Sequence, residues 1–234
     1  MLVLDDVQYT YQHELFRFDL TIERGQIVSL MGPSGAGKST LLALVAGFIS
    51  PDDGDIRING ESIVDKAPYL RPFSMLFQEH NLFAHLTVRD NIGLGLHPGL
   101  KLTPAQKHQV EHAAQQVGVA EFLDRLPEHL SGGQRQRVAL ARCFVQPHAM
   151  WLLDEPFSAL DPVLREEMLT LVKSLAEERG ITVIMVTHHL SDANAIASHF
   201  AFVAAGQIEA AGKMEELTAV HPSEALQAFV RAAS

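Results

Sequence analysis

The segment from Ile27 to Phe48 constrains the fold of this chain more than any other. A short apolar run, Ile27–Met31, leads into the glycine-rich loop Gly32–Ser39 (GPSGAGKS), and an apolar, helix-like stretch follows from Lys38. An apolar run like Ile27–Met31 is typical of a strand buried on both faces. The loop fits the pattern G-x-x-x-x-G-K-[ST], in which backbone N–H groups surround phosphate oxygens, the lysine contacts the β/γ-phosphates and the hydroxyl binds Mg²⁺. Strand, glycine loop and helix together predict a nucleotide-phosphate site in an α/β fold.

The composition narrows the class of protein. With 234 residues, 47% of them hydrophobic, the chain can form one globular domain with a large core and an inserted subdomain. The net charge of −10 and the absence of a dense Lys/Arg block argue against a nucleic-acid partner. The single cysteine, Cys143, has no partner for an intramolecular disulfide, and the N-terminus lacks the pattern of a signal peptide. The longest apolar stretch, Leu41–Ile49, is too short to span a bilayer, so we expect any membrane contact to be made through a partner.

The remaining pattern alternates strands and helices around a helical middle. Short alternating runs near the N-terminus and at Asp53–Gly60 predict an antiparallel sheet, whereas the apolar runs before residues 32, 155 and 187 predict parallel core strands. Between about residues 86 and 145 the pattern is helical. The helices that we expect cover residues 88–94, 104–117, 135–144 and 162–179, with Thr87, Thr103 and Asp161 as caps and Gly180 as a stop.

Two carboxylates follow the apolar strand that ends at Leu153. Because ligands of open α/β sheets bind at the carboxyl ends of the strands, Asp154 and Glu155 should lie beside the phosphates. There Asp154 can orient Mg²⁺, and Glu155 is free to act as the general base on the attacking water. The alternative is a solvated corner between strand and loop.

A second anion site is indicated about a hundred residues after the first. The string Leu130-Ser131-Gly132-Gly133-Gln134 directly precedes the helix that we expect from Arg135 to Phe144. Backbone N–H groups at the start of a helix attract anions. A flexible loop with an N-terminal cap is the alternative interpretation of the same residues.

Together the two glycine-containing strings resemble those of ABC-type ATPases, and the resemblance covers nearly the whole chain. It implies a P-loop NTPase of the ABC ATPase type, with a mostly parallel core sheet, an antiparallel β subdomain and an inserted α-helical subdomain. Residues of about 1–85 and 146–234 would form the catalytic core, and residues 86–145 the helical subdomain. We expect no C-terminal regulatory domain.

The resemblance also implies the roles of individual residues. In this family two subunits pair head to tail, and each signature motif clamps the ATP held by the other subunit. Glu155, Gln78 and His188 match catalytic positions, although His189 stands where the family often has an acidic residue. Mg²⁺ ligands would be Ser39, Gln78 and Asp154. ATP-binding residues would be Tyr11, Gly32, Pro33, Ser34, Gly35, Ala36, Gly37, Lys38, Ser39, Thr40, Ser131, Gly132, Gly133, Gln134 and Asp161, with Tyr9 as the other candidate for stacking on adenine.

Other strings narrow the resemblance to importers. Pro156-Phe157 stands where exporters more often carry Ala-Thr. The segments 74–79, 81–83 and 91–102 are similar to those in ATP-binding subunits of bacterial thiamine importers. That implies an ATP-hydrolysing homodimer on the cytoplasmic face of the inner membrane, bound to two permease subunits or halves near Gln78, Leu82, Phe83 and Leu86, and served by a periplasmic solute-binding protein. The alternatives are an importer of iron, polyamine or sulfate, a soluble ABC ATPase acting on DNA or ribosomes, and a small P-loop kinase, which would leave Leu130–Gln134 without a role.

Overall fold

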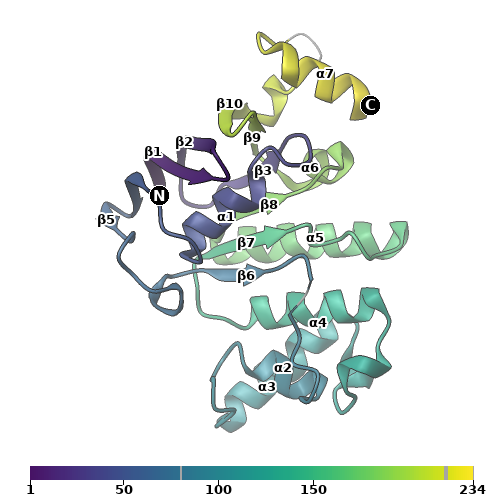
Figure 1. Cartoon of the computed structure of the whole chain (residues 1–234). Coiled ribbons are helices and arrows are strands. Elements are labelled where there is room, and N and C mark those ends of the chain that lie inside the picture. The colour runs from purple at the N-terminus through teal and green to yellow at the C-terminus, as the bar shows by residue number, and fades with distance from the viewer. Residues whose placement is uncertain (80, 219–220, 234) are drawn as a thin grey trace.

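The computed structural model describes residues 1–79, 81–218 and 221–233, and Figure 1 shows their arrangement. The strands are β1 (Leu2–Tyr11), β2 (Glu14–Ile22), β3 (Ile27–Met31), β4 (Asp53–Ile58), β5 (Glu61–Ser62), β6 (Ser74–Leu76), β7 (Met150–Asp154), β8 (Thr182–Val186), β9 (His199–Ala204) and β10 (Gln207–Lys213). The helices are α1 (Lys38–Ala46), α2 (Val88–Gly93), α3 (Pro104–Gln116), α4 (Gly132–Phe144), α5 (Pro162–Arg179), α6 (Leu190–Ile196) and α7 (Glu224–Ala233).

The described strands form one sheet in the order β5-β4-β1-β2-β10-β9-β3-β8-β7-β6. Strands β9, β3, β8, β7 and β6 pair in parallel, as the buried apolar runs predict. Strands β1, β2, β4 and β5 pair antiparallel, as does the hairpin of β9 and β10. The predicted fold class, a mostly parallel core with an antiparallel part, is therefore confirmed.

Two apolar clusters lie on opposite faces of the core strands. Along β7, Trp151 and Leu153 join the cluster that contains α4 and α5, whereas Met150 and Leu152 join the cluster that contains α1 and the antiparallel strands. Strand residues alternate between the two faces of a sheet, so a strand covered on both sides must be apolar throughout. This explains why β3, β7 and β8 are continuous buried runs that end together beside the glycine loop.

Helices α2, α3 and α4 lie together at one end of the molecule, next to β6 and β7 (Figure 1). In the chain they follow β6 and precede β7. Thr87 and Thr103 cap α2 and α3 through their side chains, as the sequence predicts. The expected start of α4 at Arg135 is wrong, because the helix begins at Gly132. Ser131 and Gln134 form a capping box there, and its two hydrogen bonds offset the low helix propensity of the glycines.

The C-terminal helix α7 packs on the outer part of the core. Leu226 and Val230 are buried against Phe200 and Phe202 of β9, and the rings of Phe202 and Phe229 lie 5.4 Å apart. Across the described residues, no helix combines the length and apolar character needed to cross a membrane.

Candidate nucleotide-binding site

The glycine loop joins the end of β3 to the start of α1, and two of its glycines have no room for a side chain. A Cβ at Gly32 (φ 148°) would lie 2.0 Å from the carbonyl oxygen of Val203. A Cβ at Gly37 (φ 107°) would lie 2.7 Å from the ring of Phe16. Both positions also have positive φ, which glycine adopts without strain. The neighbouring strands therefore require glycine here, and the loop backbone remains open toward the cavity.

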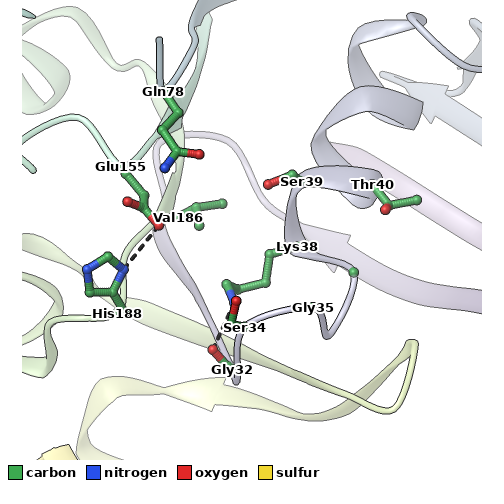
Figure 2. A pocket seen from close by; sticks show the side chains of 11 residues that line it. Gly32, Ser34, Gly35, Lys38, Ser39, Thr40, Gln78, Glu155, Val186 and His188 are labelled. Carbon is green, nitrogen blue, oxygen red and sulfur yellow. Dashed lines mark hydrogen bonds and ion pairs between the residues drawn. The ribbon is translucent and has the colours of Figure 1, made fainter.

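Lys38 is the cation at the centre of the site. Its Nζ donates hydrogen bonds to the carbonyl oxygens of Gly32, at 2.8 Å (Figure 2), and Pro33, at 2.7 Å. Partial burial lowers the pKa of Lys38, and the carboxylates of Glu155 and Asp154 oppose that shift. The side chain therefore lies folded back along the loop while its charge faces two acidic groups.

Asp154 ends β7 and is mostly buried. Burial, together with the neighbouring Glu155 charge, raises the pKa of the Asp154 carboxyl, whereas a hydrogen bond from Ser39 and the charge of Lys38 act in the opposite direction. The contact with Ser39 connects the carboxyl end of β7 with the first turn of α1. Asp154 therefore lies beside the cations and hydroxyls of the glycine loop, as the sequence predicts.

Glu155 and His188 form a pair across the ends of β7 and β8. The Glu155 Oε1 and His188 Nδ1 atoms lie 3.1 Å apart. Figure 2 shows this pair and Gln78 on one side of an opening, with Lys38 and Ser39 on the other. The imidazole of His189 stacks beside that of His188, with ring centroids 4.6 Å apart. Desolvation, aided by the charges of Arg165 and His188, lowers the pKa of His189, which favours its neutral form.

These groups surround a cavity of about 550 Å³. Of the predicted residues, its lining contains Gly32, Ser34, Gly35, Gly37, Lys38, Ser39, Thr40, Gln78, Glu155 and His188. Val186 also lines the cavity and was not predicted. Its position at the carboxyl end of a buried parallel strand is the signal that could have identified it.

The other predicted residues do not line this cavity. They are Pro33, Ala36, Asp154, Tyr11, Ser131, Gly132, Gly133, Gln134 and Asp161. Tyr11 is 54% exposed at the end of β1, whereas Tyr9 is partly buried against the core. Ser131 and Asp161 cap α4 and α5. The signature motif, Leu130–Gln134, and Asp161 therefore do not line the cavity of their own chain.

A buried polar network supports the loop that carries His188. Asp192, with its side chain only 3% exposed, accepts from Arg165 at 3.0 and 3.2 Å and from the Thr187 hydroxyl at 3.3 Å. The same hydroxyl accepts a hydrogen bond from the backbone N–H of His189 at 3.1 Å. Arg165 and Asp192 were not predicted from the sequence, because they lie in two different helices and only the fold brings them together.

The donors near the glycine loop suit Mg²⁺. Ser39, Gln78 and Asp154 supply a hydroxyl, an amide and a carboxylate oxygen, and Mg²⁺ prefers such hard oxygen ligands while taking few of them from the protein. The described residues contain no cluster of three or more His, Cys, Asp or Glu side chains that could hold a metal ion.

A second cavity, of about 850 Å³, lies between α3 and the segment that precedes β7. Gln109, His112, Phe144, His148 and Arg179 contribute to its lining. No residue of the glycine loop borders it, and it lies at the amino end of β7 rather than the carboxyl end. Although larger, it has neither a glycine loop nor a carboxylate at the end of a strand in its lining.

Comparisons with known proteins agree with this geometry. The family described as ABC transporter matches residues 15–158. The chain is 85% identical to the thiamine import ATP-binding protein ThiQ of Vibrio parahaemolyticus, over all of both chains. It is 69% identical to the ThiQ of Vibrio cholerae, over all of this chain and 98% of the relative.

Solved structures share the fold. The dimeric post-hydrolysis state of the ATP-binding cassette MJ0796, bound to ADP and Pi, is similar with a TM-score of 0.83 at 30% identity, over 92% of this chain and 99% of that one. The dimeric structure of MJ0796, described as a bacterial ABC transporter cassette, is similar with a TM-score of 0.81 over the same shares. With a phosphate loop, paired strand-end carboxylates and full-length relatives of this kind, the chain belongs to the ABC transporter family.

Proposed function

We propose that this chain hydrolyses ATP in the 550 Å³ cavity and thereby drives a membrane importer of thiamine or its phosphates. The observation that carries the proposal is the arrangement around that cavity: Glu155 and His188 face Lys38 and Ser39 across one opening. A small kinase would need the glycine loop but not a carboxylate and an imidazole at the ends of neighbouring strands.

ATP binds through its phosphates, with the backbone N–H groups of Ser34–Gly37 and the Lys38 ammonium as donors. Lys38 exchanges its two carbonyl acceptors for phosphate oxygens when the nucleotide enters. Ser39, Gln78 and Asp154 hold Mg²⁺, which when bound neutralises charge on the phosphate oxygens. Tyr11 stacks on the adenine, since its ring is exposed, and Tyr9 is the alternative.

Glu155 acts as the general base. Its carboxylate accepts the proton of the water that attacks the γ-phosphate, and a positioned base contributes about 10²–10⁴ in rate. The His188 imidazole, 3.1 Å from this carboxylate, orients it and reaches the γ-phosphate. Gln78, which lies on the same side of the opening as Glu155 (Figure 2), helps to position the water.

The working unit is a homodimer paired head to tail. Ser131, Gly132, Gly133, Gln134 and Asp161 lie outside their own cavity, so they are available to the nucleotide of a second copy. The first N–H groups of α4 lack partners within the helix and form an anion site. Residues 86–145 act as a helical subdomain that carries this site, beside a core of residues 1–85 and 146–234.

Two permease subunits or halves bind near Gln78, on the cytoplasmic face of the inner membrane, and reach a periplasmic solute-binding protein indirectly. Phe48 and Phe83 support this because they are 52% and 49% exposed, and Phe48 lies 5.3 Å from the ring of Phe77. Leu82 instead packs against the apolar cluster of the helical region. The full-length similarity to thiamine import ATP-binding proteins supports thiamine as the solute rather than iron, polyamine or sulfate.

Uptake of radiolabelled thiamine tests the proposal. A strain lacking the gene should lose uptake, a wild-type copy should restore it, and a Glu155→Gln copy should not, because the amide keeps the shape but accepts no proton. If the strain takes up thiamine normally but fails to take up another solute, thiamine is not the transported solute, whereas the proposed ATPase activity is unaffected by that result. If the Glu155→Gln copy restored thiamine uptake, Glu155 would not be the general base.

A further inference from the structure

A fully buried glutamine, Gln136, joins the signature helix α4 to the turn that carries Glu155. Its Nε2 donates to the carbonyl oxygen of Glu155 at 3.1 Å and approaches the Ser158 hydroxyl at 3.4 Å. Its Oε1 accepts from the backbone N–H of Ala159 at 3.0 Å. A buried amide is stable only when its donors and acceptor are paired, and here one side chain pairs with both ends of the turn.

The turn that Gln136 holds has an unfavourable backbone conformation at Glu155. Its φ is +48°, in the left-handed region that side chains other than glycine rarely adopt. Such a conformation is unfavourable and persists only when the surrounding structure determines it. The backbone N–H of Glu155 donates to Val186 at 3.1 Å, and the Glu155 carbonyl accepts from Gln136 and Ser158. The direction of the Glu155 carboxylate therefore depends on these few bonds.

We propose that Gln136 is a positioning residue for hydrolysis, which holds Glu155 in its strained conformation and connects it to the signature helix. The inference rests on the proposed function of Glu155 as the base. Gln136 lies on the same helix as Ser131, whose N-terminal turn faces the nucleotide of the second copy. Binding of that nucleotide is thereby transmitted through α4 to the carboxylate that acts on the chain's own ATP.

The side chain of Gln136 bonds to the turn of residues 155–159 and does not line the cavity, so its loss should affect the rate of hydrolysis separately from the binding of ATP. Phosphate binding uses Lys38 and Ser39, which stand on α1, on the other side of the cavity. Moving a catalytic group by about 1 Å costs on the order of 10²-fold in rate without changing the binding of substrate. A merely structural role would instead lower stability or affect ATP binding and turnover together.

The experiment uses the full chain with Gln136→Met, which keeps the length of the side chain and removes its amide. We expect kcat to fall by about 10–100-fold while the KM for ATP changes by less than about twofold. Gln136→Asn, which keeps the amide but shortens its reach, should show the same split if the methionine variant folds poorly. Circular dichroism and thermal unfolding establish folding for both.

The matched control is Gln146→Met, near the end of the same helix. Gln146 lies just beyond the end of α4, and its Nε2 also donates to a backbone carbonyl, that of Arg142 at 3.2 Å, rather than to the turn that carries Glu155. Its loss should leave kcat within about twofold of wild type. An equal fall in kcat for Gln136→Met and Gln146→Met would overturn the inference.

A double variant tests whether Gln136 acts through Glu155. Because residues that act as a unit are not additive, Gln136→Met should lower the single-turnover rate of Glu155→Gln by less than about threefold. The full 10–100-fold loss in that background would overturn the inference, as would normal kcat in Gln136→Met beside an inactive Glu155→Gln. Near-normal activity of Glu155→Gln alone would instead refute the proposed function.

Discussion

Arg71 should contribute more to stability than any surface arginine, because its guanidinium fastens the end of α1. The side chain is only 3% exposed, and it donates to the carbonyl oxygens of Leu44 and Val45 at 2.8 Å, Lys66 at 2.9 Å and Val64 at 3.0 Å. Carbonyls in the last turn of a helix lack partners within it, so these bonds complete the helix that begins with Lys38. Burial lowers the pKa of Arg71, which records the cost of keeping this charge out of water.

Replacing Arg71 by Met removes all of these donors. Four carbonyls lose a charged partner, but the Leu44 carbonyl keeps a hydrogen bond from Gly47, so we count the loss at the other three, at roughly 1–3 kcal/mol each. Recovery of the guanidinium's desolvation cost offsets part of this, and we expect a net loss of about 3 kcal/mol. For a chain of this size that corresponds to a fall in Tm of about 6–12 °C.

Differential scanning calorimetry measures this shift, with Arg24→Met as the control. Arg24 is exposed, so its loss should change stability by less than about 0.5 kcal/mol. Arg71→Lys should recover no more than half of the loss, because an ammonium cannot reproduce the planar set of donors. A fall in Tm below about 2 °C for Arg71→Met, or full recovery by lysine, would refute the reasoning.

Three further variants test the site. Lys38→Ala should abolish binding of a fluorescent ATP analogue with an unchanged circular-dichroism spectrum, since it removes the cation beside the phosphates; normal turnover would contradict the loop assignment. Asp154→Asn should raise the free energy of unfolding in urea near pH 7 while weakening Mg²⁺-dependent ATP binding. Because the pKa of Asp154 is raised in the folded state, its ionised carboxylate lowers the free energy of unfolding above that pKa. The stability gained by Asp154→Asn should therefore vanish below the ordinary pKa of 3.8. A gain that persists below that pH would show that the pKa is not raised. Ser131→Arg in a Glu155→Gln background should stay monomeric with ATP in size-exclusion chromatography, whereas Glu155→Gln alone should dimerise.

Local signals predicted the elements of the fold well. Thr87, Thr103 and Asp161 are caps and Gly180 is a stop, because each of these roles depends only on residues within about one helical turn. The start of α4 was missed because glycines usually indicate a loop, and the capping box of Ser131 and Gln134 outweighed them. The glycine loop could be named in advance from its motif, and Asp154 and Glu155 from the apolar strand that precedes them. Gln78 and His188 were named only through the resemblance to ABC-type ATPases.

The supporting contacts could not be predicted in the same way. Gln136 and Arg71 are polar residues without a local motif, and their partners lie 5 to 27 residues away along the chain. Arg165 and Asp192 pair across 27 residues from two different helices. Such side chains are satisfied only by the folded arrangement, so a pattern of neighbouring residues does not distinguish them from exposed ones.

The two ends of the sheet limit how this protein can associate with other chains. The described strands form a 10-stranded sheet, and its outermost strands are short: β5 has two residues and β6 has three. An exposed edge strand offers unpaired backbone groups to which a foreign strand can add, and short edges make such addition unfavourable. Aggregation by edge-to-edge pairing of sheets is therefore disfavoured in this protein.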